Sequence, residues 1–579
     1  MITRRTVLSG AAAAGIGFVS ARASAQTLPP LAVVIQLSTG ARYVYDVANG
    51  SDLGDFASTI GGFTQRCIRV DHPGFPLSVF FRPDRSSSRV EVVFELGRVL
   101  GGSLPTTLPA YTATINAGDQ TLATVQVPVH YWYSRWRWQS SPRPIVGNVN
   151  QLISQGLLPP YDTVGGISAT SVTQKCLPSS SPFKKAAPCF AVNTTTFVPS
   201  PTLPALMTGY KPYTVMGTSD ITPYMPRTGE RPDIGLVTEP QAQFICTGSP
   251  VALGALRAWA EGAGTVPWHI RDEVTGAPLN LLTYPNASWY WDQRVGAPWI
   301  PLGDNPVTID TAHAPALGYV PYMLTGDPYH LEDMQFAANW DRGALPPKYR
   351  PSIGQSRSFA WSIRNLAQCA RVTPETVPTW LLPRNYWLGF LSESRAFLEA
   401  NYANNPSPVM AMFRSTSDIN SGRDEGVSAP GGTWIDPWQD EFVATVIGWV
   451  IRMGFNDWQT AFDWKLGTTI ARTGNTSGWC RAYATPYRVI LRSALTAPLV
   501  STWSEAWALT KQVRGIPTVT DPDTWVDPDM TYLAYTRGVL AMGQSLERPG
   551  TANGLEWSTQ QLRSKGWKTA YKWRLGSGL

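Results

Sequence analysis

The sequence predicts a multidomain α+β protein in which an N-terminal β-sandwich or barrel precedes an (α/α) toroid of helical hairpins. Short β-branched runs separated by Gly, Pro and Asp occupy residues from about 28 to 140, a pattern typical of all-β domains. From about residue 238 the apolar residues recur with the period of helices. Many helices in series, joined by short turns and without alternating strands, favour a toroid or a solenoid.

The first 25 residues have the order of features found in twin-arginine signal peptides. Arg4 and Arg5 precede an apolar run from Leu8 to Val19, and Ala23-Ser24-Ala25 offers a cleavage site. We therefore expect the twin-arginine translocase to export the chain to the periplasm or the medium. The run is shorter than the roughly 18 residues of a membrane helix, so no stable anchor is expected after cleavage. An ordinary buried helix is the alternative.

The predicted division of the chain follows the changes in periodicity. Residues 26–140 form the β-sandwich or barrel, 141–237 an irregular connection rich in Pro, Ser, Thr and Gly, and 238–579 the (α/α)-toroid catalytic domain. Strands are expected at 32–37, 77–81, 89–96, 112–117 and 124–129. Helices are expected at 239–261, 314–324, 329–340, 356–371, 379–403, 438–453, 457–470, 479–496 and 504–513, with Asp327 as a cap and Pro328 at a first helical position.

Composition excludes some classes of function and favours another. The net charge of +6 falls to +3 without Arg4, Arg5 and Arg22, and no basic run suggests a nucleic-acid partner. Charged residues make up only 15%, whereas the chain has 24 Trp and 22 Tyr. Flat aromatic faces suit stacking on sugar rings, although a large Trp-rich core accounts for most of them.

Cysteine and histidine spacing argues against metal sites and for one disulfide. Cys176 and Cys189 bracket a Pro/Ser/Lys-rich loop and are the pair expected to join after export. No C-x-x-C, H-E-x-x-H or H-x-x-E-H occurs, and neither does a G-x-S-x-G elbow. We therefore expect no metal and no cofactor.

Several stretches are similar to exported carbohydrate-active enzymes. They are Tyr224-Met225-Pro226-Arg227-Thr228-Gly229, Pro267-Trp268-His269-Ile270-Arg271-Asp272, Asp310-Thr311-Ala312-His313-Ala314-Pro315, Leu324-Thr325-Gly326-Asp327-Pro328-Tyr329 and Trp438-Gln439-Asp440-Glu441-Phe442. These stretches and the order of a β domain followed by helices make the chain resemble (α/α)-toroid polysaccharide lyases and glycoside hydrolases. The nearest architecture is that of exo-rhamnogalacturonan lyase-like proteins. The resemblance is architectural and spans under half of the chain. It implies a polysaccharide or oligosaccharide substrate.

The densest group of chemistry-bearing residues follows the first long predicted helix. Trp268, His269, Arg271 and Asp272 place an aromatic ring, a base, a cation and an acid within five residues. We expect His269 and Asp272 to be catalytic and Trp268 and Arg271 to bind substrate. The alternatives are a surface pair of Arg271 with Asp272 and a buried structural histidine.

A second group opens the two following helices. His313 begins a helix, where the helix dipole keeps an imidazole neutral and basic. Tyr329 is a catalytic-acid candidate and Trp340 a sugar platform, with capping and packing roles as the alternatives.

Later helices supply cations and acids. Arg357 and Arg364 are seven residues apart and so share a helix face, which suits binding of uronate carboxylates. Asp440 and Glu441 are candidate catalytic acids, and Trp438, which precedes them, is a candidate substrate-binding residue. Salt-bridged arginines and dipole-stabilising acids are the alternatives.

Three functions remain open from the sequence. The first is a polysaccharide lyase acting on a uronic-acid-containing glycan, with arginines as neutralisers, His269 or His313 as base and a tyrosine as acid. The second is an inverting glycoside hydrolase that pairs Asp272 or Glu273 with Asp440 or Glu441. The third is a non-catalytic glycan-binding protein.

Overall fold

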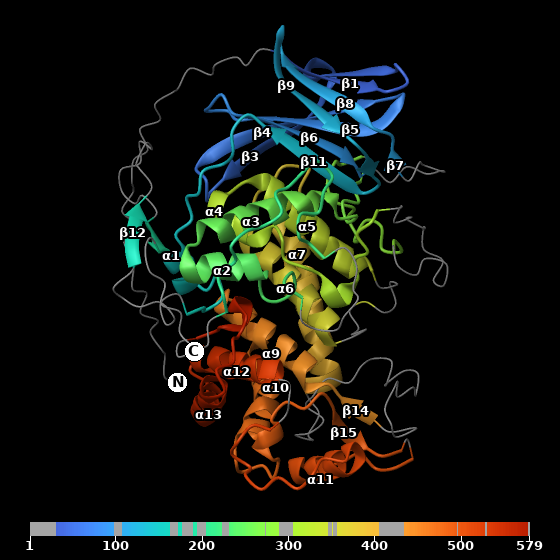
Figure 1. Cartoon of the computed structure of the whole chain (residues 1–579). Coiled ribbons are helices and arrows are strands. Elements are labelled where there is room, and N and C mark those ends of the chain that lie inside the picture. The colour runs from blue at the N-terminus through green and yellow to red at the C-terminus, as the bar shows by residue number, and fades with distance from the viewer. Residues whose placement is uncertain are drawn as a thin grey trace, which may run out of the picture.

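The computed structural model describes residues 30–97, 107–162, 172–176, 189–193, 204–222, 231–272, 274–288, 305–344, 350, 356–403, 433–494, 496–526 and 530–576. The signal segment, Glu273 and the 224–229 stretch lie outside these ranges. The mixed fold class is confirmed, with antiparallel sheets in residues 31–139 and mostly helices after them (Figure 1).

Two antiparallel sheets form the N-terminal part. The first has the order β2 (Arg42–Asp46), β1 (Leu31–Leu37), β8 (Tyr111–Ala117), β9 (Gln120–Val127). The second has the order β11 (Ser134–Gln139), β6 (Val90–Leu96), β5 (Phe75–Pro83), β4 (Phe63–His72), β3 (Ser51–Ser58). β7 (Thr107–Leu108) pairs with β10 (His130–Tyr131). Within the described residues neither main sheet closes into a barrel.

The sheets pack face to face through the apolar side of alternating strands. In β1, Val33 and Ile35 are fully buried whereas their neighbours are partly exposed. Phe94 stacks on Trp136 at 4.0 Å, and the Trp136 indole N–H donates to the Tyr111 hydroxyl of the other sheet at 3.0 Å. The expected strands therefore form, with their boundaries shifted by a few residues.

The second sheet has a polar face that the helices cover. All seven residues of β6 are buried, because one of its faces meets the first sheet and the other meets the helical part (Figure 1). Period-2 alternation puts Glu91 and Glu95 on the helix side, together with Arg135 and Arg137 of β11. These charges would suit a solvated face, but in the structure they form an interface.

Most of the described elements after residue 139 are helices. Their bounds are α1 (Val149–Ser154), α2 (Glu239–Thr247), α3 (Pro250–Gly262), α4 (Tyr319–Thr325), α5 (Pro328–Gly343), α6 (Ser356–Val372), α7 (Arg384–Leu398), α9 (Pro437–Arg452), α10 (Gln459–Thr473), α11 (Trp503–Arg514), α12 (Met530–Ser545) and α13 (Thr551–Ser564). α5 packs on α6, α6 on α7 and α9, and α9 on α10 and α12, so sequential hairpins make up the layers below the sheets (Figure 1). None of the helices in the described part of the chain is long and apolar enough to cross a bilayer.

Three helix predictions are wrong. The expected helix 314–324 begins only at Tyr319, so His313 does not open it. The expected helix 239–261 is divided into α2 and α3, because Gly248 takes a left-handed conformation (φ 66°) and Pro250 starts a new helix. The expected helix 479–496 instead contains β15 (Val489–Arg492), which pairs with β14 (Thr433–Ile435). Its β-branched start after Pro486 favours a strand. The cap by Asp327 with Pro328 at the first position is confirmed.

A short hairpin carries the cysteines expected to pair. β12 (Val172–Cys176) and β13 (Cys189–Asn193) are antiparallel, and Cys176 is the direct partner of Cys189. Directly opposed residues have Cα atoms about 4.5–5.5 Å apart, within the range that a disulfide spans. Their side chains lie outside those described, so the disulfide stays a prediction.

Candidate functional site

A buried ion network joins the polar face of the second sheet to α5. Glu332 accepts hydrogen bonds from Arg82 at 2.8 Å, from Arg271 at 2.7 Å and from Arg135. All four side chains have no solvent exposure. We call this set, with Glu91, Glu95 and Arg137, the polar sheet–helix interface.

The first predicted catalytic group lies inside this interface. His269 is fully buried, and its Nε2 faces the Asp333 carboxylate at 3.1 Å while its Nδ1 faces the carbonyls of Val266 and Tyr133. Trp268 is also buried and donates its indole N–H to Asp333. Both ring nitrogens of His269 are therefore occupied by fixed protein partners.

The neighbours of His269 also have structural partners. Arg271 is held by Glu95 and Glu332, and Asp272 caps its own turn by accepting from the Val274 amide at 2.9 Å. Tyr329 lies between the guanidinium groups of Arg135 and Arg137, each 4.1 Å from its ring centre. Burial raises the pKa of Tyr329 well above its ordinary value, which is unfavourable for a proton donor.

The predicted acids of α9 are likewise paired in the core. Asp440 accepts from the Lys465 ammonium group at 2.6 Å, and Glu441 accepts from Arg472 and from Thr469. Both acids are nearly inaccessible, and Trp340 of α5 is buried in the apolar core. The structure thus gives these residues packing and pairing roles instead of a shared cleft.

His313 differs from His269, the other predicted base. It ends the short 3-10 turn Thr311–His313, which Asp310 caps by accepting from the Ala312 amide at 2.8 Å. The Asp310 carboxylate also faces His313 Nδ1 at 2.7 and 2.9 Å. Nδ1 must therefore carry the proton, which leaves Nε2 as a lone-pair acceptor. That Nε2 is buried and has no hydrogen-bond partner within the described residues.

The electrostatics keep this pair in the form that a general base needs. Burial lowers the pKa of His313 below its ordinary value of 6.5, and the positive charge of Arg357 lowers it further, against the effect of Asp310. Burial acts to raise the pKa of Asp310, but the hydrogen bond and charge of His313, the Ala312 amide and the charge of Arg357 together outweigh it, so this carboxyl group stays ionised. The imidazole is therefore neutral at pH 7 and oriented by a carboxylate.

Arg357 supplies a cation near the pair, attracted by Asp310 and Asp436 but without an ion pair within the described residues. Thr311 donates a hydrogen bond to Ser358 at 3.1 Å, which ties the His313 turn to the first residues of α6. Arg357 is 5% exposed, and its Nε and one terminal nitrogen have no hydrogen-bond partner in the described part of the chain. A buried guanidinium with open donor positions suits a carboxylate ligand.

An aromatic group completes the site. The Arg357 guanidinium lies 5.5 Å from the centre of the Trp438 ring. Trp438 in turn stacks on Tyr532 (5.8 Å, 13°) and on Tyr487 (6.1 Å, 27°). Arg488 lies over the Tyr487 ring at 5.2 Å and continues the row of cations and rings. We call Asp310, His313, Arg357, Trp438 and Tyr487 the His313 site.

Arg364 supports this site from below. Its guanidinium group is fully buried and donates to the carbonyls of Ala314, at 2.6 Å, and Gly235. It therefore fixes the chain directly after His313 and does not face a ligand. On the other side, Arg231 and Asp233 form a bidentate pair, and both line a cavity of about 10 Å³ with Asp310 and His313.

The structure thus brings together His313, Arg357 and Trp438 of the predicted residues. Sequence reasoning missed Tyr487, Arg488, Arg231 and Asp233 as neighbours. The signal for Tyr487 and Arg488 was present, because Pro486 breaks the helix that we expected there.

Metal binding finds no support in the described ranges, which contain no cluster of His, Cys, Asp and Glu able to hold an ion. The chain matches no protein-family model, no curated protein and no solved structure. Any functional conclusion therefore depends on the chemistry of the site.

Proposed function

We propose that the protein is an exported polysaccharide lyase that cleaves a uronic-acid-containing glycan by β-elimination at the His313 site. The observation that carries the proposal is the Asp310–His313 pair, whose Nε2 has no partner within the described residues and on which the nearby charge of Arg357 acts. The hairpin series α4 to α13 supports a further proposal, that the helical part is an (α/α) toroid whose inner helices hold this site.

Each group has a role that its surroundings favour. Arg357 binds the uronate carboxylate and neutralises it, which acidifies the neighbouring C5 proton of the sugar. His313 Nε2 removes that proton, and the C4–O4 glycosidic bond breaks as a C4=C5 double bond forms. The imidazolium, which Asp310 stabilises, returns the proton to the departing oxygen. Trp438 is itself buried, and the partly exposed rings of Tyr487 and Tyr532 that stack on it provide apolar surface for the sugar ring.

The hydrolase alternative has less support. An inverting hydrolase needs two carboxyl groups about 6.5–9.5 Å apart with a water between them. Asp310 is engaged by His313, Asp440 by Lys465, and Glu441 by Arg472. A purely binding role would need neither the oriented base nor the open guanidinium, so the lyase is the best-supported function.

The test is an ultraviolet assay for unsaturated product on a panel of polyuronates, with purified residues 26–579. His313→Gln should lower the rate at least about 100-fold, because a general base contributes about 10²–10⁴-fold. Arg357→Gln should also lower the rate strongly. Matched controls are His72→Gln and Arg66→Gln in the second sheet, which should keep the wild-type rate.

Three results would contradict the proposal. One is full activity of His313→Gln, and another is release of saturated reducing ends by the wild type. The third is the absence of any product from every polyuronate while binding persists, which would favour the glycan-binding function.

A further inference from the structure

A second cavity, separate from the His313 site, lies at the edge of the polar sheet–helix interface. It has a volume of about 350 Å³ and is bounded by the end of β11, the 210–213 segment, α3 and the α4–α5 junction. Ligand pockets in proteins commonly have about 300–1,000 Å³. The cavity is therefore large enough for a single sugar ring.

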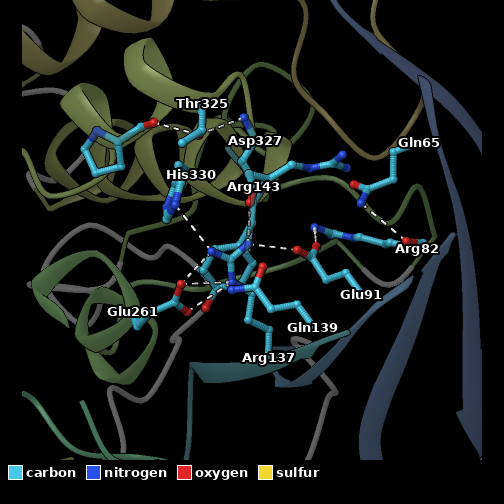
Figure 2. Close-up of polar contacts among 12 residues, drawn as sticks. Gln65, Arg82, Glu91, Arg137, Gln139, Arg143, Glu261, Thr325, Asp327 and His330 are labelled. Atoms are coloured by element: carbon cyan, nitrogen blue, oxygen red, sulfur yellow. Dashed lines mark hydrogen bonds and ion pairs between the residues drawn. The ribbon is translucent and has the colours of Figure 1, made fainter. Parts of the chain in front are cut away.

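Arg137 forms the polar floor of this cavity (Figure 2). It donates to Glu261 with two hydrogen bonds, to Glu91 at 2.8 Å and to Asp327 at 2.7 Å. Arg137 is thus saturated, whereas the side chain of Glu261 keeps 21% of its surface exposed. The open side of the Glu261 carboxylate can accept hydrogen bonds from a ligand.

His330 presents a donor at the same floor. Arg137 approaches its Nε2 at 3.3 Å, and since a guanidinium only donates, Nε2 accepts and Nδ1 carries the proton (Figure 2). His330 is 6% exposed and lines the cavity, and its Nδ1 has no partner within the described residues. Because buried polar groups are normally paired, this N–H calls for an acceptor from outside the protein.

Arg257 places an unpaired positive charge at the mouth. It is solvent-exposed on α3, lines the cavity, and has no carboxylate partner in the part of the chain that the structure describes. The other two lining cations are compensated, since Arg143 is bidentate to Asp84 and Arg137 is surrounded by acids. Arg257 is therefore the lining cation left to bind an anion.

An aromatic wall faces these polar groups, and the sequence makes room for it. Gly254 lies inside α3, where glycine destabilises a helix relative to alanine. A Cβ added there would lie 2.4–2.5 Å from the Tyr210 ring and its hydroxyl. Gly254 thus lets the Tyr210 ring lie directly against the helix as a wall of the cavity.

We propose that this cavity binds a small hydroxylated carboxylic acid of the size of a single hexuronic acid. Arg257 binds its carboxylate, Glu261 and His330 bind its hydroxyl groups, and Tyr210 packs against its C–H face. The cavity shares no residue with the His313 site, so this proposal and the lyase proposal can fail independently.

Isothermal titration calorimetry with galacturonate tests the proposal, with galactose as the neutral match and acetate as the carboxylate alone. Galacturonate should bind the wild type at one site, and galactose and acetate should bind at least about 10-fold more weakly. Arg257→Gln should weaken galacturonate binding by about 10- to 100-fold, the range for losing one charged hydrogen bond. Gly254→Ala should weaken it too, by displacing Tyr210, although alanine is the better helix former.

Arg66→Gln, on the far strands of the second sheet, is the control variant and should bind galacturonate as the wild type does. Because Arg357 of the His313 site is itself proposed to bind a uronate carboxylate, a comparison of Arg257→Gln with Arg357→Gln separates the two sites. The proposal is overturned if galacturonate does not bind, if Arg257→Gln binds it unchanged, or if galactose or acetate binds equally well. Loss of binding in Arg357→Gln together with retention in Arg257→Gln would also overturn it, by assigning the bound ligand to the His313 site.

Discussion

Replacing Glu332 by Gln should destabilise the protein far more than replacing an exposed, equally paired glutamate. Glu332 is the common acceptor for Arg82, Arg135 and Arg271, and all four side chains are buried. Without its charge, Arg135 keeps only the more distant carboxylate of Asp333, at 4.0 Å, among the described ion pairs. Removing one partner of a buried ion pair costs about 3–5 kcal/mol, because the remaining charge is left without compensation.

The matched control is Glu375→Gln. Glu375 also pairs with an arginine, Arg384, but its side chain is 81% exposed. Exposed pairs contribute about 0–1 kcal/mol. Urea unfolding at pH 7, followed by tryptophan fluorescence, should therefore give a midpoint shift on the order of 1 M for Glu332→Gln and a shift several times smaller for the control.

The pH dependence provides an independent check. Burial alone would raise the pKa of Glu332, but the charges of Arg82, Arg271 and Arg135 outweigh it and hold the pKa well below 4.5. A lowered folded-state pKa stabilises the protein above the unfolded value and loses that effect as the pH falls. The difference between wild type and Glu332→Gln should be full at pH 7 and shrink below about pH 4. Equal midpoint shifts for both variants at pH 7 would refute the reasoning.

Two further predictions concern Asp341 and the pair of Cys176 and Cys189. Burial raises the pKa of Asp341 to about 7, and its carboxyl group accepts a hydrogen bond from Asn365 at 2.7 Å. A raised carboxyl pKa removes stability as the pH rises from 3.8 to 7. Asp341→Asn should therefore be more stable than the wild type at pH 8, by up to about 4 kcal/mol, and similarly stable at pH 4. A higher urea midpoint for the wild type at pH 8 would refute this. If Cys176 and Cys189 are joined, alkylation of the unreduced, unfolded protein should modify the four cysteines that are free in the structure. Alkylation after reduction should modify two more, and mass spectrometry counts the modified thiols. Six modified thiols without reductant would exclude the bond.

The sheets could be predicted because their signal is local. Alternation of apolar residues and the turn residues between the runs are sufficient to place the strands near β1, β5, β6 and β8. The alternation of apolar and polar residues does not show what packs against the polar face of the second sheet. Glu91 and Arg137 have the spacing of solvent-facing residues, and only the packing of α3 and α5 against them makes them an interior network.

The candidate site was predictable only where its residues are close in sequence. Asp310 and His313 are three residues apart, so their pairing follows from a short turn. Tyr487 comes from a segment 174 positions later (487 − 313) and was predicted as a helix, so its approach to Trp438 could not be foreseen. Conversely, the concentration of reactive side chains around His269 gave no information on burial, because the acids that bind them come from α5 and β6.

The comparison of His269 with His313 explains why we propose His313, and not His269, as the base. Both are largely buried, both face a carboxylate, and burial lowers the pKa of each. The difference lies in the second nitrogen, which in His269 is held by two backbone carbonyls and in His313 has no partner within the described residues. A lowered pKa alone indicates only desolvation, whereas an oriented ring with one unpartnered lone pair, near the Arg357 cation, suits the proposed proton abstraction. The open nitrogen, and not the density of polar residues in the sequence, is therefore the reason to assign the chemistry to His313.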